Sequence, residues 1–226
     1  MKKENFEKEF SAFTQHLNKE ISDDIGNWTI RGFIDIYKNI YTISYDTKIV
    51  SKILETHLLP MILKFADNVG FDVILPNHQN YYPDFSFVYK KDNKIKFAVD
   101  LKTTYTTKKG NCNGFTLGSH GEYFINRQSN KNVQFPYGSY LGHYCLGIIY
   151  TRVEKEDLEI YKIDDLLSIK SVIKDFIFFF QEKWKIAHYR SGSGNTANIG
   201  SITNIQDIIN GNGIFTKLGE DIFDEY

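Results

Sequence analysis

Apolar side chains recur at helical spacing in two stretches near the N-terminus. The first stretch has aromatic and aliphatic residues three and four positions apart, at Phe6, Phe10, Phe13 and Leu17. This spacing predicts a helix over residues 5–24, and the same pattern predicts a second helix over residues 47–68. Pro60 should kink or divide the second helix, because proline removes an amide donor and clashes with the preceding turn. A third helix is expected over residues 164–174.

Strand signals occupy much of the remaining chain. Residues 33–43 are rich in β-branched and aromatic side chains, which predicts a strand or a hairpin. Alternation of apolar and polar residues predicts strands over residues 85–89 and 94–101, and further strands are expected at 73–75, 144–153 and 176–188. The polar, glycine-bearing residues 191–201 are expected to form a loop. The mixture of elements predicts an α+β fold.

Length and composition fit an ordinary globular protein. The chain has 226 residues, which suits one domain, and its 42% hydrophobic content is enough to fill a core. Cys112 and Cys145 lack zinc or C-x-x-C spacing, so we expect free thiols in a reducing compartment. No segment reaches the roughly 18 apolar residues of a membrane span, and no signal-peptide pattern opens the chain. We therefore expect a soluble, cytoplasmic protein without a membrane partner.

Charge alone does not indicate a nucleic-acid partner. The net charge is −1, whereas proteins that bind DNA by charge are usually basic. The distribution is uneven, because lysines crowd residues 94–109 while residues 219–226 are acidic. A lysine-rich patch can steer phosphates, but it can equally be a solvated face.

Two acidic residues and a lysine fall on one predicted hairpin. The strands at 85–89 and 94–101 are joined by the turn-forming residues 91–93. If Tyr89 pairs with Ile95, Asp84 lies opposite Asp100, with Cβ atoms about 4.5–5.5 Å apart. Lys102 is two residues beyond Asp100 and so projects from the same face.

Such a cluster suits metal-assisted phosphodiester hydrolysis. Opposed carboxylates repel each other, and a divalent cation removes that conflict. Oxygen ligands without His or Cys favour Mg²⁺, which typically takes one or two carboxylates. We expect one or two such ions per active site. Lys102 could position or deprotonate a water and offset charge on the phosphorus-centred transition state. The P-D…D-x-K pattern also arises by chance, and a one-residue slip of register would separate the carboxylates.

Several blocks resemble one known family in their order and nearly in their spacing, over about residues 46–215. The blocks are Tyr82-Pro83-Asp84-Phe85, Val99-Asp100-Leu101-Lys102-Thr103-Thr104-Tyr105-Thr106, Phe115-Thr116-Leu117-Gly118, Tyr150-Thr151-Arg152-Val153, Gly192-Ser193-Gly194-Asn195-Thr196 and Asn198-Ile199-Gly200-Ser201-Ile202. They resemble the EcoRV family of type II restriction endonucleases, within the PD-(D/E)xK nuclease superfamily. The resemblance implies a restriction-endonuclease-like core, a mixed β-sheet flanked by helices, with a DNA-binding subdomain.

The resemblance also implies roles for individual residues. Asp84 and Asp100 would be metal-binding carboxylates, with the Leu101 carbonyl as a further ligand, and Lys102 would be the catalytic lysine. Glu55 matches the family's additional acidic residue and would support a second metal or an ordered water. Without the resemblance, Glu55 reads as an ordinary solvated helix residue.

Two loops and a threonine pair would contact DNA by the same resemblance. The recognition stretch would enter the major groove with Gly192, Ser193, Gly194, Asn195 and Thr196. Asparagine suits adenine and a threonine methyl suits thymine, although these residues also favour a plain surface turn. The implied site is GATATC, cut to blunt ends.

Gln79 and Asn80 would approach the minor groove and backbone, while His78 stands where the family has another glutamine and reads equally as an exposed loop residue. Thr103 and Thr104 would touch phosphates, or form a strand-favouring pair.

A palindromic site implies a homodimer that kinks double-stranded DNA at its deformable central TA step. We expect one domain over residues 1–226, with dimerisation elements mainly in its N-terminal part and the recognition loop at 191–201. A cognate DNA methyltransferase is expected in the host, without a stable complex. Relative to the family, the sequence has additional N-terminal residues and lacks a basic C-terminal segment, which predicts weaker or more salt-sensitive DNA binding.

Hydrolysis would proceed by in-line attack of water, leaving 5′-phosphates. A repair or recombination nuclease with the same core is an alternative, which the intact major-groove loop disfavours. A catalytically inactive DNA-binding module is another, which the intact Asp84, Asp100 and Lys102 disfavour.

Overall fold

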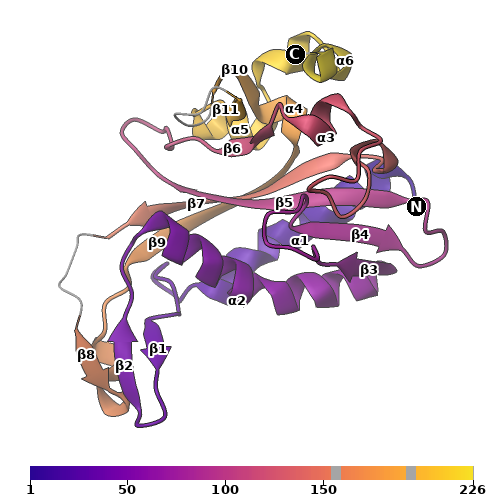
Figure 1. The fold of residues 1–226 in the computed structure, drawn as a ribbon. Helices are drawn as coiled ribbons and strands as arrows, with labels where there is room; N and C mark the ends of the chain where they lie inside the picture. Colours follow the sequence, from indigo (N-terminus) through magenta and orange to yellow (C-terminus); the bar gives the residue numbers. More distant parts are fainter. Residues whose placement is uncertain (154–158, 192–196, 226) are drawn as a thin grey trace.

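A five-stranded mixed sheet forms the centre of the computed structural model, which describes residues 1–153, 159–191 and 197–225 (Figure 1). Its strands lie in the order β3-β4-β5-β7-β9. They span β3 Phe71–Ile74, β4 Phe85–Tyr89, β5 Lys96–Tyr105, β7 His143–Arg152 and β9 Ile173–Glu182. β5 and β7 run parallel and the other neighbours antiparallel. The predicted α+β class with a mixed sheet flanked by helices is confirmed.

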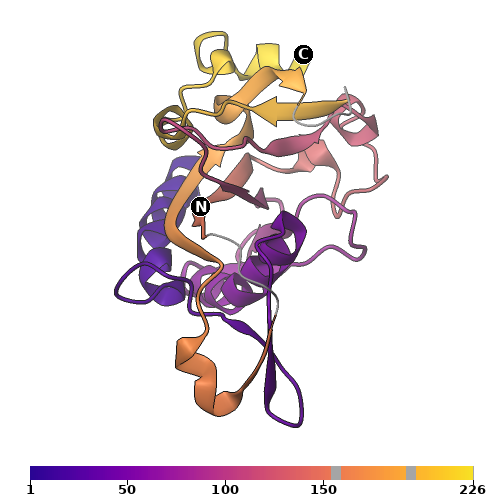
Figure 2. The same ribbon diagram turned by 90° about the vertical axis from the view of Figure 1, so that its left-hand side faces the viewer.

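Two long helices, α1 (Lys3–Ile21) and α2 (Thr47–Asn68), cover one face of this sheet (Figures 1 and 2). Two α1 phenylalanines are fully buried there: Phe6 stacks on Phe97 at 4.1 Å between ring centroids and Phe10 on Phe180 at 4.0 Å. Aromatic burial of this size dominates core energetics. Pro60 lies inside α2, which continues past it, so the expected division does not occur.

A second sheet, in the order β10-β11-β6, packs over the opposite face. Its strands are β6 Thr116–Ser119, β10 Ala187–Ser191 and β11 Asn198–Ser201. The surrounding short helices are α3 Glu122–Ile125, α4 Lys183–Ile186, α5 Ile205–Asn210 and α6 Glu220–Glu225, with 3-10 turns at Tyr137–Ser139 and Ile214–Lys217. Apolar residues of both sheets share one core cluster, including Ala98, Phe179 and Ile199.

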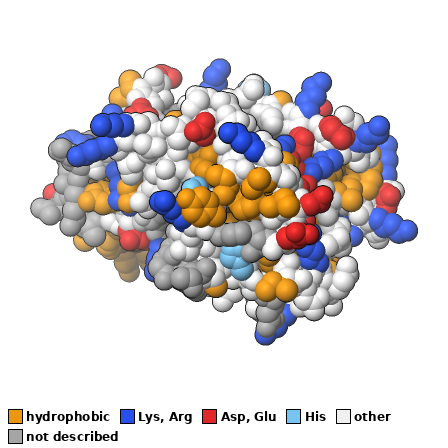
Figure 3. Space-filling model, turned by 90° about the horizontal axis from the view of Figure 1, so that it is seen from above, with side chains coloured by type: hydrophobic (Ala, Val, Ile, Leu, Met, Phe, Trp, Pro, Cys, Tyr) orange, Lys and Arg blue, Asp and Glu red, His pale blue; other side chains and the backbone are white. Residues whose placement is uncertain are grey.

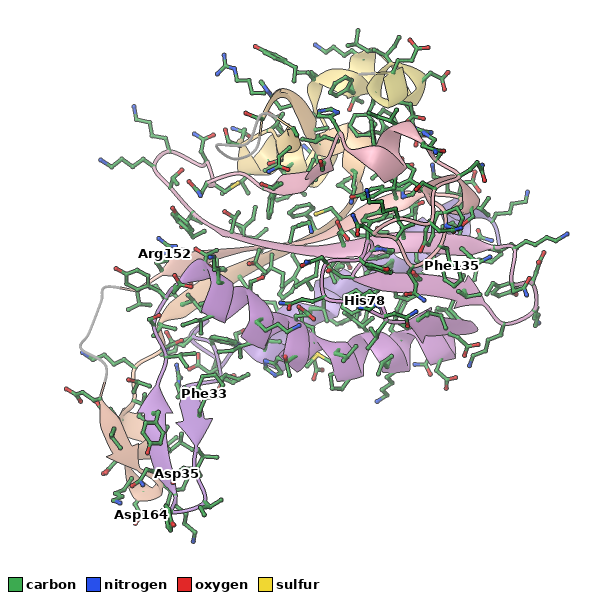
Figure 4. The ribbon with its side chains drawn as sticks, viewed as in Figure 1. Phe33, Asp35, His78, Phe135, Arg152 and Asp164 are labelled. Atoms are coloured by element: carbon green, nitrogen blue, oxygen red, sulfur yellow. The ribbon has the colours of Figure 1, made fainter. Side chains whose placement is uncertain are left out.

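A third sheet, β1-β2-β8, projects from the body, and Figure 4 shows Phe33 and Asp35 on this projection. Its strands are β1 Gly32–Ile34, β2 Asn39–Thr42 and β8 Ile160–Lys162, with a 3-10 turn at Ile163–Ser168. Asp35 closes the hairpin by accepting hydrogen bonds from the Tyr37 and Asn39 backbone N–H groups, at 2.9 Å each. Of the two forms expected for residues 33–43, a strand or a hairpin, the hairpin is present.

Three expectations from the sequence are wrong. Residues 164–174 are not one helix: the 3-10 turn ends at Ser168, and β9 begins at Ile173, where Ile173 pairs with Arg152 of β7. Leu167 is 99% exposed, so the segment has no continuous apolar face to bury as a helix.

Residues 176–188 are likewise not one strand. β9 ends at Glu182, which pairs with Tyr144 near the start of β7, and α4 begins at the next residue, Lys183. The chain makes the single turn of α4 and pairs again, as β10, with β11. Residues 198–201 of the expected loop form β11, because β10 and β6 supply partners on both sides and Ile199 is buried between them.

None of the helices in the described ranges is long and apolar enough to cross a membrane.

The central sheet needs a glycine at the position beside Lys102. Gly147 pairs with Lys102 on one side and Phe179 on the other, and a Cβ atom there would lie 1.9 Å from the Phe179 ring. We predict that Gly147→Ala destabilises the protein by about 1–3 kcal/mol through overpacking, seen as a fall of several degrees in Tm. Phe179→Leu should make room, so the double variant should be more stable than the sum of the single effects predicts; strict additivity would contradict the packing argument.

Candidate active site

The hairpin of β4 and β5 has the register that places the two aspartates together. Phe85 pairs with Val99, and Phe87 pairs with Phe97. The same register, continued by one residue, places Asp84 opposite Asp100. The Asp84 backbone N–H donates to Asp100 Oδ1 at 3.2 Å, and the Leu101 N–H donates to Asp84 Oδ2 at 2.8 Å. Each carboxylate is thus oriented by the opposite strand.

Lys102 reaches both carboxylates from the same face of β5. Its Nζ lies 3.1 Å from Asp100 Oδ2 and 3.9 Å from Asp84 Oδ2. The apolar residues between these polar ones point the other way, into the core beneath α1 and α2: Phe97, Val99 and Leu101. The period-two alternation of β5 therefore places the core side chains on one face of the strand and the charged side chains on the other.

The two aspartates experience different surroundings. The Asp84 side chain is 35% exposed, whereas that of Asp100 is 6% exposed. Burial raises the pKa of Asp84 to about 6, against the opposing effect of the Lys102 ammonium. Burial acts in the same direction on Asp100, but Lys102 and a second lysine outweigh it and hold its pKa well below the usual range. Burial alone would lower the pKa of Lys102, but Asp100 and Asp84 raise it above its ordinary value.

That second lysine, Lys183, was not identified from the sequence. It is the first residue of α4, and its Nζ lies 2.7 Å from Asp100 Oδ2 with both side chains 6% exposed. The strand register explains the contact, because Asp100 pairs with Cys145 and Cys145 with Gln181, two residues before Lys183. Only the order of β5, β7 and β9 brings it there, so no local sequence signal could have indicated it.

A groove with a cavity volume of about 470 Å³ opens beside Asp84 and Lys102. Several of the predicted metal-binding, catalytic and DNA-contacting residues line this groove: Glu55, Asp84, Leu101, Lys102, Thr103 and Thr104. α2 and the segment before β6 supply lining residues that the sequence did not indicate, among them Lys48, Ser51 and Asn113. The Arg152 guanidinium braces the edge by donating to Thr47 Oγ1 at 2.8 Å (Figure 4 labels Arg152).

The donor set fits a hard divalent cation. Within the described residues, no group of three or more His, Cys, Asp or Glu side chains gathers as a metal cage. Magnesium usually takes only one or two carboxylates and keeps water at its other positions, so two aspartates suffice. Glu55 also lines the groove. Its Oε1 accepts a hydrogen bond from Lys52 Nζ at 2.7 Å, and its negative charge helps to raise the pKa of Asp84.

The predicted DNA-contacting residues are spread over several places. His78, Gln79 and Asn80 are exposed on the loop before β4, outside the lining of the groove, and Figure 4 labels His78 there. Thr103 is partly buried and Thr104 is 2% exposed; both belong to β5. The threonine pair is thus part of a strand, as its residue type favours.

The predicted recognition residues Gly192, Ser193, Gly194, Asn195 and Thr196 lie outside the described residues. β10 leads into them and β11 follows, as antiparallel neighbours. A second cavity of about 250 Å³ adjoins this end of β10 and is lined by His188, Arg190 and Ser191. Asn113, Gly114 and Phe115 line both cavities, which therefore border a common segment.

Charge does not single out a broad area on the face that Figure 3 shows. Seen from above, lysines and arginines lie among carboxylates, around an apolar patch (Figure 3). This mixture agrees with the net charge of −1.

Comparisons with known proteins bear directly on this arrangement. The family model described as "Restriction endonuclease EcoRV" matches residues 24–226. The curated Type II restriction enzyme EcoRV of Escherichia coli is 39% identical over 213 residues, covering 93% of this chain and 85% of that protein. Among solved structures, the bacterial homing endonuclease I-Ssp6803I matches with a TM-score of 0.24 and 17% identity, over 59% of this chain and 75% of that one, too weak a likeness to bear on the fold.

A family match over most of the chain and a relative of this identity show that the protein is a nuclease. The chain therefore belongs to the EcoRV family of restriction endonucleases.

Proposed function

We propose that this restriction endonuclease hydrolyses double-stranded DNA with Mg²⁺, within the palindrome GATATC, leaving blunt ends with 5′-phosphates. The observation that carries the proposal is the cluster of Asp84, Asp100 and Lys102 on one face of β5, beside the groove. The choice of sequence rests on the block from Gly192 to Thr196, which resembles the family's recognition stretch.

Asp84 and Asp100 would hold the cation, with the Leu101 carbonyl beside them, and Glu55 would orient water in the groove. When bound, magnesium would supply positive charge to the scissile phosphate and lower the pKa of an attacking water. Lys102 would leave its carboxylate partners to orient that water and offset charge in the transition state. Its 26% exposed side chain lines the groove, which allows this movement.

DNA recognition would take place near the second cavity, which adjoins the end of β10. Asn195 and Thr196 would read adenine and thymine edges, while Gln79, Asn80 and Thr103 would contact the minor groove or backbone. The Arg190 guanidinium, exposed beside the second cavity, is a further candidate for a phosphate contact. Thr104 would act through the strand, since its side chain is buried.

A homodimer would present two such sites to the two halves of a palindrome. We propose that the projecting sheet forms the contact, which refines the expectation of N-terminal dimerisation elements. The sheet and its turns expose large apolar side chains, at Phe33, Ile34, Ile36, Tyr37, Ile160 and Leu167. Apolar surface of this extent on a soluble protein marks an interaction site. A host methyltransferase would protect the same sequence without binding stably.

Plasmid cleavage tests the activity. We expect cutting in Mg²⁺ at GATATC, located by sequencing the ends, and a loss of at least about 10³-fold in rate for Asp100→Ala, because several kcal/mol of transition-state stabilisation depend on the metal. Asp84→Ala, at a more exposed position, should lose activity similarly while folding. Asp72→Asn, on the edge strand β3, is the matched control and should cut normally. Persistent cutting by both site variants, or ends scattered over unrelated sequences, would count against the proposal.

Asp84 makes the metal-free protein pH-sensitive. The unfolded chain releases this proton near pH 4, while the folded protein keeps it up to about pH 6. The contribution of Asp84 to stability therefore falls as the pH rises from about 4 to about 6, and the cost persists above. In EDTA, Asp84→Asn should raise Tm by about 2–4 °C at pH 8. Because the Asp84 side chain is partly exposed, solvent screening limits the gain in the free energy of unfolding to about 1 kcal/mol. At pH 4 the gain should vanish; an equal gain at both pH values would refute the electrostatic cause.

The dimer contact can be tested with a single charge. Ile34 is 59% exposed on β1, and we expect Ile34→Asp to raise the dimer dissociation constant by at least about tenfold, since a carboxylate would be desolvated in the interface. Sedimentation velocity over a dilution series measures this. Leu218→Asp is the control, because Leu218 is equally exposed, at 58%, but lies near α6. Equal behaviour of the two variants would place the contact elsewhere.

A further inference from the structure

Two ammonium groups converge on one carboxylate oxygen. Lys183 Nζ lies 2.7 Å and Lys102 Nζ 3.1 Å from Asp100 Oδ2, while Asp100 Oδ1 accepts the Asp84 backbone N–H at 3.2 Å. Both oxygens of Asp100 are therefore occupied from fixed directions. The catalytic role proposed for Lys102 uses only one of the two cations.

The two lysines approach Asp100 from different sides. Lys102 lines the groove and its side chain is 26% exposed. Lys183 does not line that groove; its side chain is 6% exposed and its Nζ lies 4.0 Å from the centroid of the Tyr82 ring. It borders a cavity of only about 10 Å³, together with Tyr123 and Tyr137. Lys102 thus faces the substrate side, and Lys183 is fixed in the interior behind Asp100.

Stability alone does not explain a lysine at this position. The free energy lost when an ion pair is desolvated is about as large as the attraction between its charges. Apolar residues of similar volume often stabilise a protein as well or better. Lys102 already pairs with the same Asp100 oxygen, at 3.1 Å. A second buried cation on the same oxygen therefore points to a requirement of the site, namely that the carboxylate stays in place after Lys102 moves.

We propose that Lys183 is a positioning residue: it holds the Asp100 carboxylate in the orientation that receives magnesium and so frees Lys102 to act on the DNA. The inference rests on the metal site proposed above. Partners behind a metal ligand fix its direction, and their loss typically costs 10–100-fold in metal affinity or activity. Without Lys183, Asp100 would retain Lys102 as its cation and compete with the reaction for it.

The test measures metal binding directly as well as cleavage. Free Mn²⁺, followed by electron paramagnetic resonance, reports binding to the protein on a GATATC duplex that is kept uncleaved on ice. We expect Lys183→Met to weaken Mn²⁺ binding about tenfold or more and to raise the Mg²⁺ concentration for half-maximal cleavage by a similar factor. Affinity for the same duplex in EDTA should stay within about twofold of wild type, because Lys183 lies outside the groove lining.

A neighbouring lysine provides the matched control. Lys185 lies on the same short helix, but its Nζ pairs with Glu182 Oε2 at 2.6 Å. Lys185→Met should leave both metal titrations unchanged. Lys183→Gln, which keeps a donor without the charge, should fall between wild type and Lys183→Met, and it serves as the test if the methionine variant does not fold.

The outcomes separate this inference from the function on which it rests. If wild type neither binds Mn²⁺ nor cleaves, the proposed metal site fails and the role of Lys183 fails with it. If wild type binds and Asp100→Ala does not, the metal site stands. An unchanged or tighter titration in the Lys183 variants would then overturn the positioning role alone.

Discussion

A buried carboxylate that must stay charged determines the arrangement of this site. Asp100 is 4% exposed, and such a group remains ionised only if cations and hydrogen-bond donors replace its water. Lys102 and Lys183 supply the charge, and the backbone of β4 supplies a donor to the other oxygen. Breaking a buried pair by removing one partner is costly, so these contacts tie the register of one hairpin to the position of a distant helix.

Sheet order is what makes that connection possible. β7 lies between β5 and β9, so Asp100, Cys145 and Gln181 form one row across three strands. β9 ends at Glu182, and the chain turns into α4 just where Lys183 can reach back to Asp100. The same turn leads into β10, which belongs to the second sheet and precedes the proposed recognition residues in the sequence. The end of β9 thus connects the proposed catalytic cluster with the strand that precedes the proposed recognition residues.

Local features were predictable from sequence and distant ones were not. Asp84, Asp100 and Lys102 belong to one hairpin whose turn fixes its register, so period-two counting was enough to bring them together. Lys183 contacts Asp100 across 83 positions of sequence, and no pattern within residues 176–188 shows where strand pairing stops. The same lack of tertiary information explains why the sequence predicted a loop where β11 lies. Pairing with β10 and β6, rather than the residues of β11 themselves, makes this segment a strand.

The charges of the site explain why a divalent ion and DNA would be needed together. With Asp84 ionised, two carboxylates and two ammonium groups sum to zero, so the cluster is balanced without metal. A divalent ion adds two positive charges, which a phosphodiester and the negative charge that develops during its hydrolysis would offset. The partly exposed Asp84, with its pKa raised to about 6, is the group whose ionisation such an ion would favour most. Asp100 is held ionised in advance by its lysines, so the proposed metal site would combine one carboxylate that is already fixed with one whose ionisation responds to the metal.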